Sequence, residues 1–430
     1  MDIAKEMIMP NVYLSCIRTN KFKTSCLSIN LLAPLHRESA SKNALIPNVL
    51  RRGTATLPDM AAIFTTLDSL YGAKISPIVR KKGEIQVIGL FANFADEAFI
   101  FENEGILERI SALMGEMLLM PNTHGGLLRR EYVESERDKL LEKIRGRIND
   151  KRSYSIYRLF ELMCAMEAYA TDKDGTEEEA QSITATALTR HYHDVLSSSP
   201  LQIIYCGSAE FPRVREAVKK ALTGIPRASK LEEPDLGTDL RMNSLETQPR
   251  VFNEEMQVTQ GKLAIGFRLG PCMEDPNSAA IRVFNTMYGG GITSKLFMNV
   301  RERLSLCYYA SSLVDLHKGV MAVTSGIEVS KYNDALAEIM KQLGALTDGD
   351  FSEHELLSAK RSVANYYRTT QDSYAALEDF YLSQALIGPD CSPAELAALC
   401  EEIKADEVIE IAKGVECDAI YFLHGPEEDN

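Results

Sequence analysis

The histidines of this chain are the first side chains to test for metal chemistry. A zinc peptidase holds its metal with two imidazoles on one helical face and uses a carboxylate to activate the bound water. Such a site needs histidines four residues apart, and none of the seven histidines has a partner at that spacing. His191 and His193 are two apart in a helical pattern, so their side chains point about 200° apart. We expect both, and His36 in a polar loop, to be solvated surface residues.

Other signatures of catalysis are missing as well. The sequence contains no G-x-S-x-G nucleophile elbow, no P-loop and no dinucleotide-binding fingerprint. Three consecutive glycines, Gly289-Gly290-Gly291, suggest a phosphate cradle, but the P-loop lysine does not follow at its required place. We therefore predict that these glycines form a tight turn that connects helices.

The segment after these glycines is the best candidate for a binding site. Leu296, Phe297 and Val300 have the apolar spacing of a helix, and an extended pattern starts shortly after it. Arg301 near the helix end and Tyr308 on the strand would then lie side by side. A guanidinium and a phenol are both donors that suit a peptide carbonyl. The alternative is an arginine on an exposed helix face and a tyrosine on a strand, without a shared role.

The elements that must position these residues follow one order twice, with strands first and helices later. In the first half we expect strands at 12–16, 26–30, 75–80, 84–91 and 201–206, and helices near 58–70, 104–119, 128–147, 154–169 and 184–196. In the second half we expect strands near 255–268, 306–315, 319–327 and 419–423, and helices near 277–288, 331–347, 352–370, 373–386 and 405–414. Residues 37–42 form a polar stretch, and 43–50 suit a helix except for Pro47.

Three short matches relate the two halves. The Tyr-Gly pairs at 71–72 and 288–289, the Ser-Tyr pairs at 153–154 and 373–374, and the strand-ending glycines at 207 and 425 are 217, 220 and 218 residues apart. This regularity predicts a duplicated α+β domain, each copy a mostly antiparallel sheet covered by helices. Two unrelated α+β domains are the alternative.

A polar, acidic stretch separates the halves. Residues 231–237 contain Pro and Gly and no apolar period, as is typical of a linker. We therefore expect an N-terminal domain at 1–230, a linker at 231–253 and a C-terminal domain at 254–430.

Composition excludes several classes of protein. The 430 residues are 45% hydrophobic and 25% charged, as in ordinary globular proteins, and a net charge of −14 disfavours binding to nucleic acid or to an anionic membrane. The charge is uneven: residues 1–230 hold 31 Lys+Arg and 28 Asp+Glu, a net of +3, and residues 231–430 hold 16 and 33, a net of −17. The acidic half would attract a basic surface or basic peptides, or would simply be a solvated exterior.

The chain has the features of a reduced cytoplasmic protein. No signal peptide and no apolar run of about 18 residues is apparent. The nine cysteines are odd in number and form no C-x-x-C pair, which favours free thiols over a disulfide frame. We expect a cytoplasmic location.

At residues 289–308 the chain resembles the pitrilysin/insulinase family of inverzincin zinc peptidases, which includes the processing peptidases of mitochondria. The second domain of that family carries a Gly-rich turn, then L-F-x-x-V/I-R-E and then L-x-Y, and the resemblance covers nearly the whole chain. It implies a bacterial, processing-peptidase-like chain whose two duplicated domains form half of a peptidase clamshell. It also implies that Arg301 and Tyr308 bind the substrate backbone near the scissile bond.

The first domain departs from the family at the zinc motif. Active members carry H-x-x-E-H, then a short apolar piece and Gly-Thr, which is present here at 53–54. Counting back from Gly-Thr places Ala44 at the first His, Pro47 at the catalytic Glu and Asn48 at the second His. Alanine has no donor atom, proline offers no base and asparagine is a weak ligand. By this alignment the motif is degenerate.

The last zinc ligand of the family is a Glu on a later helix. The match places Lys143 at that position, with Glu142 one residue away if the alignment slips. A lysine would repel zinc. The resemblance therefore implies no metal cofactor and no independent proteolysis, with zinc expected only on a partner subunit.

These observations lead to three hypotheses. The first is a non-catalytic subunit that forms a heterodimer with a zinc-bearing homologue and helps to enclose and bind peptide or unfolded polypeptide, with Arg301 and Tyr308 on the substrate backbone. The second is a scaffold or interaction protein with the same fold and no peptide binding. The third is a zinc peptidase whose metal site has moved, using His36 and Glu residues of the 131–142 helix.

Overall fold

The chain divides into two compact units, each built from three segments. The structure is a computed structural model and describes residues 2–100, 105–228, 248–270, 277–388 and 390–426. Unit 1 comprises Met1–Arg145, Thr171–Leu236 and Ser373–Leu386, and unit 2 comprises Gly146–Ala170, Gly237–Asp372 and Ile387–Asn430.

Unit 1 is a mixed sheet with helices on both faces. Its strands are β1 (Asp2–Met9), β2 (Val12–Arg18), β3 (Thr24–Pro34), β4 (Lys74–Lys82), β5 (Ile85–Ala95), β8 (Leu201–Gly207) and the short pair β6 (Thr123–His124) and β7 (Leu127–Leu128). Its helices are α1 (Arg37–Leu50), α2 (Met60–Asp68), α3 (Ile106–Leu119), α4 (Arg130–Gly146), α6 (Glu177–Ser182), α7 (Ala185–Ser198), α8 (Phe211–Ala221) and α12 (Tyr374–Leu386). The six long strands lie in the order β1-β2-β8-β3-β5-β4.

Unit 2 has a five-stranded sheet in the order β11-β12-β10-β13-β9. The strands are β9 (Arg250–Glu255), β10 (Gly261–Arg268), β11 (Cys307–Asp315), β12 (Val320–Ile327) and β13 (Glu416–His424). The α-helices are α5 (Lys151–Met163), α9 (Ser278–Asn285), α10 (Tyr332–Thr347), α11 (Glu353–Thr370), α13 (Pro393–Glu402) and α14 (Ala405–Lys413). Two π-helical segments, η4 (Thr286–Gly290) and η5 (Leu296–Arg303), follow α9.

The two sheets have one topology. In unit 1, β2 pairs parallel with β8, which is followed by antiparallel β3, β5 and β4. In unit 2, β9 pairs parallel with β13, which is followed by antiparallel β10, β12 and β11. The strands therefore correspond one to one in chain order, and β1 is an additional edge strand. This confirms the expected fold class: two α+β units of the same topology, each with a mostly antiparallel sheet covered by helices.

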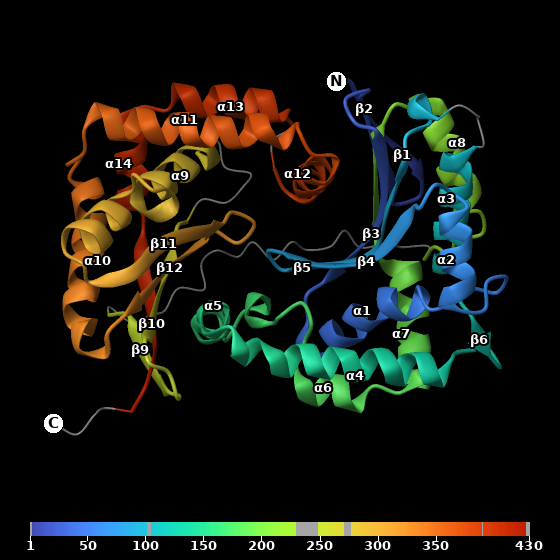
Figure 1. Cartoon of the computed structure of the whole chain (residues 1–430), viewed down its shortest axis with the longest axis horizontal. Helices are drawn as coiled ribbons and strands as arrows, with labels where there is room; N and C mark the ends of the chain where they lie inside the picture. Colours follow the sequence, from blue (N-terminus) through green and yellow to red (C-terminus); the bar gives the residue numbers. More distant parts are fainter. Residues whose placement is uncertain (1, 101–104, 229–247, 271–276, 389, 427–430) are drawn as a thin grey trace. The chain divides into compact units, whose positions relative to one another are not determined.

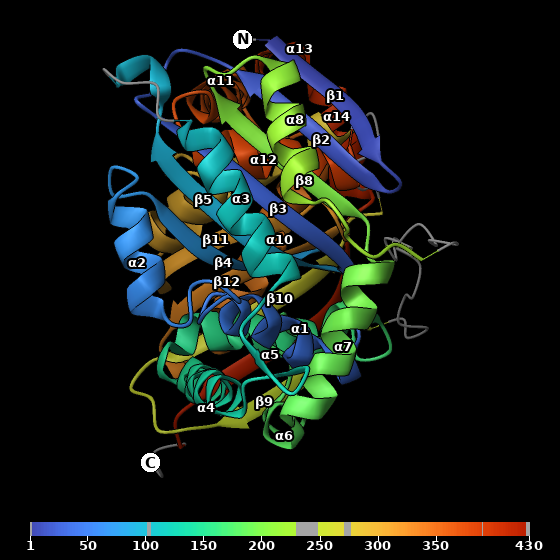
Figure 2. The ribbon, with the colours of Figure 1, turned by 90° about the vertical axis from the view of Figure 1, so that its right-hand side faces the viewer.

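Each sheet is covered on one face by a helix whose sequence lies between two segments of the other unit. In unit 1, α1, α3, α7 and α8 lie on one face of the sheet and α12 lies on the other, over β8 and β3 (Figures 1 and 2). In unit 2, α9, α10 and α14 lie on one face and α5 on the other, over β10 and β13 (Figure 1). The two helices that carry the repeated Ser-Tyr pair at or near their first residue are thus equivalent.

This exchange differs from the contiguous domains expected at 1–230 and 254–430. Residues 146–170 lie within the first expected domain but belong to unit 2, and 373–386 lie within the second but belong to unit 1. Of the expected linker at 231–253, residues 231–247 lie outside the described residues, and β9 begins at Arg250. The hydrophobic pattern identifies a helix but does not say which sheet buries its apolar face.

Burial of apolar side chains explains why residues 37–50 form one helix although the sequence predicts a polar stretch at 37–42 and an interruption at Pro47. The polar residues 37–42 belong to α1, which continues through Pro47 and buries Ala44, Leu45 and Val49. Tertiary packing of this face outweighs the hydrogen bond that proline removes. The sequence pattern also missed β1, α8 and α13. No helix in the described ranges combines the length and apolar character needed to cross a membrane.

Candidate functional site

The helix that carries Arg301, η5, is held to the rest of unit 2 by two buried apolar side chains and by the contacts of Lys295. Leu296 and Val300, one turn apart, are fully buried. Lys295, just before η5, donates to the carbonyl of Asp350 at 2.7 Å and lies 3.0 Å from the carboxylate of Glu355 on α11. These contacts leave the opposite face of the helix, with Arg301, in solvent.

Gly289 sets the entry to this segment. A Cβ at this position would lie 2.7 Å from the backbone N of Ser312 on β11 and 2.7 Å from Cδ1 of Leu296. Only glycine permits this approach of η4 to the sheet. By contrast, a Cβ at Gly291 would lie 3.7 Å from its nearest neighbour, Thr286. Gly289 and Gly290 thus belong to η4 itself, and the predicted turn between the helices begins only at Gly291; Gly289 is the residue that permits the close contact with β11.

The end of η5 is widened. The N–H of Leu304 bonds to the carbonyl of Asn299, five residues back, at 3.2 Å, and the N–H of Leu306 bonds to that of Val300 at 3.0 Å. Ser305 between them has φ of +51°, in the left-handed region that residues other than glycine seldom occupy. π-Helical turns and such strained residues occur often at functional sites. This turn connects η5 directly to β11, which begins at Cys307.

Arg301 and Tyr308 line one pocket across this turn, as the sequence predicts. The pocket has a volume of about 430 Å³, and we call it the Arg/Tyr pocket; its lining residues are Arg301, Glu302, Ser305, Leu306, Cys307, Tyr308 and Glu328. The Arg301 side chain is 42% exposed and Tyr308 is 63% exposed. A large exposed tyrosine beside an exposed guanidinium fits a contact surface better than a packing role.

The electrostatics of the Arg/Tyr pocket are mixed. The guanidinium of Arg301 lies 4.7 Å from the Phe297 ring and 3.5 Å from the Glu302 carboxylate. Burial raises the pKa of the Cys307 thiol, against the hydrogen bond from Ser325 and the nearby charge of Arg301. The thiol is thus protonated at neutral pH, and no lining side chain is a base held against a nucleophile. The pocket offers donors to a carbonyl and acceptors to a cation, which is the chemistry of binding.

Sequence reasoning missed the two carboxylates of the pocket. Glu302 follows Arg301 directly and stands in the quoted motif, so it could have been found. Glu328 could not, because it reaches the site through strand register: Ile327 pairs with Cys307 across β12 and β11. That pairing brings together residues twenty apart.

The three positions that match the zinc motif hold no ligand set. Ala44 is buried in the core of unit 1, and Pro47 is buried inside α1. Asn48 turns its side-chain amide back to its own helix, where Nδ2 donates to the Ala44 carbonyl at 2.9 Å. Zinc, which the family implies, does not fit these side chains.

Lys143, at the position of the last zinc ligand, forms an ion pair within unit 1. Its ammonium lies 2.8 Å from the carboxylate of Asp174, near the start of α1. On the same helix, Glu136 accepts a 2.7 Å hydrogen bond from Arg52 and lies 2.7 Å from Lys139. A cation at the expected ligand position and two cations on the buried Glu136 carboxylate would both repel a metal.

The remaining histidines do not form a metal site in the described part of the chain. Nowhere in that part do three or more His, Cys, Asp or Glu side chains come together in a way that could hold an ion. His36 is exposed before α1 and His193 is exposed on α7, as expected. His191 is different, because it is half-buried with Nε2 2.7 Å from Oδ1 of Asn43. Burial and the charge of Lys42 lower the pKa of His191.

Comparisons with known proteins identify the family of this chain. Residues 182–363 match the domain family described as "Peptidase M16 inactive domain". The "Probable inactive metalloprotease YmfF" of Bacillus subtilis (strain 168) is 34% identical over 412 residues, 96% of this chain and 95% of that protein. A conserved protein of Enterococcus faecalis V583 has a crystal structure with a TM-score of 0.88 and 26% identity, with 100% of each chain covered. The structure of a peptidase M16 inactive domain from Pseudomonas fluorescens shares the fold, with a TM-score of 0.77, 16% identity, and 100% and 99% of the chains covered. This chain belongs to the M16 peptidases, the pitrilysin/insulinase family, and is a member of the inactive type.

Proposed function

We propose that this chain is the non-catalytic subunit of a heterodimeric cytoplasmic peptidase. Its partner would be a homologous subunit that carries zinc, and the substrate would be a peptide or an unfolded polypeptide. The chain itself holds no cofactor. It contributes the Arg/Tyr pocket, which binds the substrate backbone and helps to place it at the partner's metal.

One contrast carries this proposal. The zinc positions of unit 1 hold Ala44, Asn48 and Lys143, whereas unit 2 keeps Arg301 and Tyr308 exposed in one pocket. A chain that had become only a scaffold would have no need for a guanidinium and a phenol in solvent beside a strained turn. Retained binding groups beside a lost metal site favour a complementary subunit over a scaffold.

The test is reconstitution of proteolysis with the zinc-bearing homologue from the same source. Arg301→Ala removes a charge-assisted donor to the substrate, so kcat/KM of the pair should fall roughly tenfold or more. Arg303→Ala is the matched control, because Arg303 is exposed on the same helix and is not part of the pocket lining. Its expected kcat/KM is that of the unchanged pair.

Tyr308→Phe tests the second donor. Loss of one neutral hydrogen bond should lower kcat/KM roughly fivefold. Tyr366→Phe is the control, since Tyr366 is 62% exposed on α11 and Tyr308 is 63% exposed. Unchanged proteolysis with both Arg301→Ala and Tyr308→Phe would refute the role of the pocket, and stoichiometric zinc in this subunit purified alone would refute the whole assignment.

A further inference from the structure

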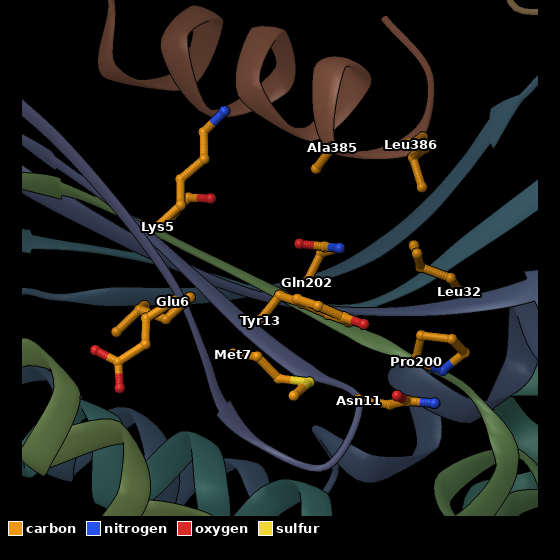
Figure 3. Close-up of a pocket in the computed structure, with 12 residues that line it drawn as sticks. Lys5, Glu6, Met7, Asn11, Tyr13, Leu32, Pro200, Gln202, Ala385 and Leu386 are labelled. Carbon is orange, nitrogen blue, oxygen red and sulfur yellow. The ribbon is translucent and has the colours of Figure 1, made fainter. Parts of the chain in front are cut away.

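Unit 1 contains a second cavity, and the proposed function makes no use of it. Its volume is about 520 Å³, within the range of roughly 300–1,000 Å³ typical of small-ligand sites. Strands β1, β2, β8 and β3 form its floor, and the C-terminal end of α12 forms its roof (Figure 3). We call it the Gln202 pocket, after the amide side chain on its floor.

Strand register brings three polar side chains together on this floor. Tyr13 pairs with Gln202 across β2 and β8, and directly opposite residues share a face of the sheet. Ser15 follows Tyr13 by two residues on β2, so the alternation of a strand turns it to the same face. Figure 3 shows the Gln202 amide and the Tyr13 ring in the space between the sheet and α12. The floor therefore presents a carboxamide and two hydroxyls, all uncharged at neutral pH.

Two of these side chains are deeply buried and have no partner in the protein. Gln202 is 8% exposed and Ser15 is 4% exposed, and neither side chain forms a hydrogen bond within the described residues. Buried amides and hydroxyls are nearly always paired, because an unpaired polar group gives up its bonds to water without replacement. Both side chains line the pocket. A ligand that bonds to both is therefore favoured over one that only fills the space.

The two charged residues of the lining are already engaged. The carboxylate of Glu6 lies 3.3 Å from Arg215 on α8, and the Nζ of Lys5 lies 5.9 Å from the centre of the Tyr381 ring. A charged group of a ligand would be buried here without a counter-charge of its own, which is costly. The pocket therefore favours an uncharged ligand.

One end of the pocket is apolar. Leu32 and Pro200 from the sheet side face Leu386 at the end of α12 (Figure 3). This end suits an apolar side chain, but a wholly apolar ligand would leave Gln202 and Ser15 unpaired. The ligand therefore has an apolar part and an uncharged polar part.

We propose that the Gln202 pocket binds an uncharged, extended segment of a peptide. The Gln202 carboxamide has an acceptor and a donor side by side, which match the C=O and N–H of one peptide residue. Tyr13 and Ser15 lie about 7 Å apart along β2, which is the distance between alternate residues of an extended chain. Their hydroxyls bond to the backbone on either side, and an apolar side chain lies at the apolar end. This second site takes its ligand class from the proposed function and uses no residue of the Arg/Tyr pocket.

Fluorescence anisotropy of the whole chain tests this with the peptide Ser-Leu-Ser, capped by a neutral coumarin at its N-terminus and by an amide at its C-terminus. It should bind equally well at about 50 and at about 500 mM NaCl, because no ion pair is formed. An ester oxygen in place of the Leu N–H should weaken binding roughly fivefold, as expected for one neutral hydrogen bond. Gln202→Leu should cause at least this loss, and the ester should cost nothing further in that variant. Gln181→Leu is the control, because Gln181 is exposed on α6.

Two further variants locate the bound peptide. Ser15→Ala should weaken binding roughly threefold, and Ala385→Trp should abolish it by filling the space beneath α12. Arg301→Ala should leave the affinity unchanged, so the Gln202 pocket and the Arg/Tyr pocket can fail independently.

Several results would overturn the proposal. They are a peptide that does not bind, equal affinity of the unchanged chain for amide and ester, unchanged affinity in Gln202→Leu, and binding that survives Ala385→Trp. Displacement of the labelled peptide by octanol but not by the unlabelled peptide would show a purely apolar site. A loss of affinity in Arg301→Ala would place the peptide at the Arg/Tyr pocket instead.

Discussion

At the scale of single residues, Asp96 joins three strands of unit 1 through one carboxylate. Its Oδ2 accepts from Ser25 Oγ at 2.6 Å and from the N–H of Ser208 at 2.8 Å, and its Oδ1 accepts from Ser208 Oγ at 2.5 Å and from the N–H of Ala98 at 2.9 Å. Burial acts to raise the pKa of Asp96, but the hydrogen bonds from Ser208, Ser25 and Ala98 outweigh it and lower the pKa.

This gives a prediction for pH dependence. Because the pKa of Asp96 is lower in the folded chain than in the unfolded one, its contribution is present above the unfolded value of about 4 and is lost as pH falls through the folded value. Asp96→Asn should therefore destabilise the chain by roughly 1–3 kcal/mol at pH 7 and by less at pH 3. Urea unfolding midpoints of the unchanged chain and of Asp96→Asn, measured from pH 3 to 7, give the difference in stability between them. Asp68→Asn, at an exposed site on α2, is the control. A stability difference for Asp96→Asn that is as large at pH 3 as at pH 7 would contradict the lowered pKa of Asp96.

Residue by residue, the sequence could identify those site positions that a local motif contains. Arg301 and Tyr308 lie seven apart in one helix–strand unit, and Ala44 and Asn48 lie in one short segment. Glu328 required the β11–β12 register. Such sites depend on long-range packing that no local pattern contains.

At the scale of elements, Gly289 decides how η4 approaches β11. Gly289→Ala would place a methyl group 2.7 Å from the Ser312 N and from Leu296 Cδ1, so the helix or the strand must move. We expect a loss of roughly 1–3 kcal/mol of stability and weaker binding of the peptide proposed as the ligand of Arg301, which lies on the next helix. Thermal unfolding of the variant measures the first effect. Gly291→Ala, where the new methyl has room, should be close to neutral, and equal losses in the two variants would show that contact with β11 is not the cause.

The winding of η5 also lies beyond local sequence rules. Its apolar spacing, with Leu296 and Val300 inward, predicts a helix correctly, but an α-helix and a π-helix bury the same two residues. The wider turn arises where Asn299 bonds to Leu304 and where its side chain donates to Gln342 on α10 at 2.8 Å. The residue whose carbonyl accepts this wider bond therefore also has a side-chain partner 43 residues away.

At the scale of the whole molecule, the exchanged helices make the two halves of the chain depend on each other. Leu377, Tyr381 and Leu382 of α12 are buried in a cluster with Ile17 and Ile204 of the unit 1 sheet. Burial of each such side chain is worth roughly 1.5–3 kcal/mol, so the three together approach the 5–15 kcal/mol typical of total domain stability. Sequence periodicity found both helices, but the assignment of each to a sheet rests on contacts over more than a hundred residues.

Polar contacts fix the segment 146–170 to unit 2 in the same way. Arg268 donates to the carboxylate of Asp418 at 2.9 Å and also bonds to the Glu167 carboxylate, and Lys318 lies 2.7 Å from Glu167. Arg250 donates to the Met163 carbonyl at the end of α5 at 2.8 Å. Without this segment, two buried cations of unit 2 would lose a carboxylate partner, a loss that costs roughly 3–5 kcal/mol in a buried pair.

A chain divided at 236/237 tests this dependence. The fragment 1–236 lacks α12 and the fragment 237–430 lacks α5, so neither should unfold cooperatively alone, and both should bind the dye ANS through the uncovered sheet face. Mixed in equal amounts, they should regain a cooperative transition in circular dichroism, because each supplies the helix that the other lacks. The fragment 1–236 extended by residues 373–386 through a flexible linker is the control, and it should lose most of its ANS binding. If 1–236 alone melts as sharply and at the same temperature as the intact chain, α12 does not stabilise unit 1 as its buried contacts indicate.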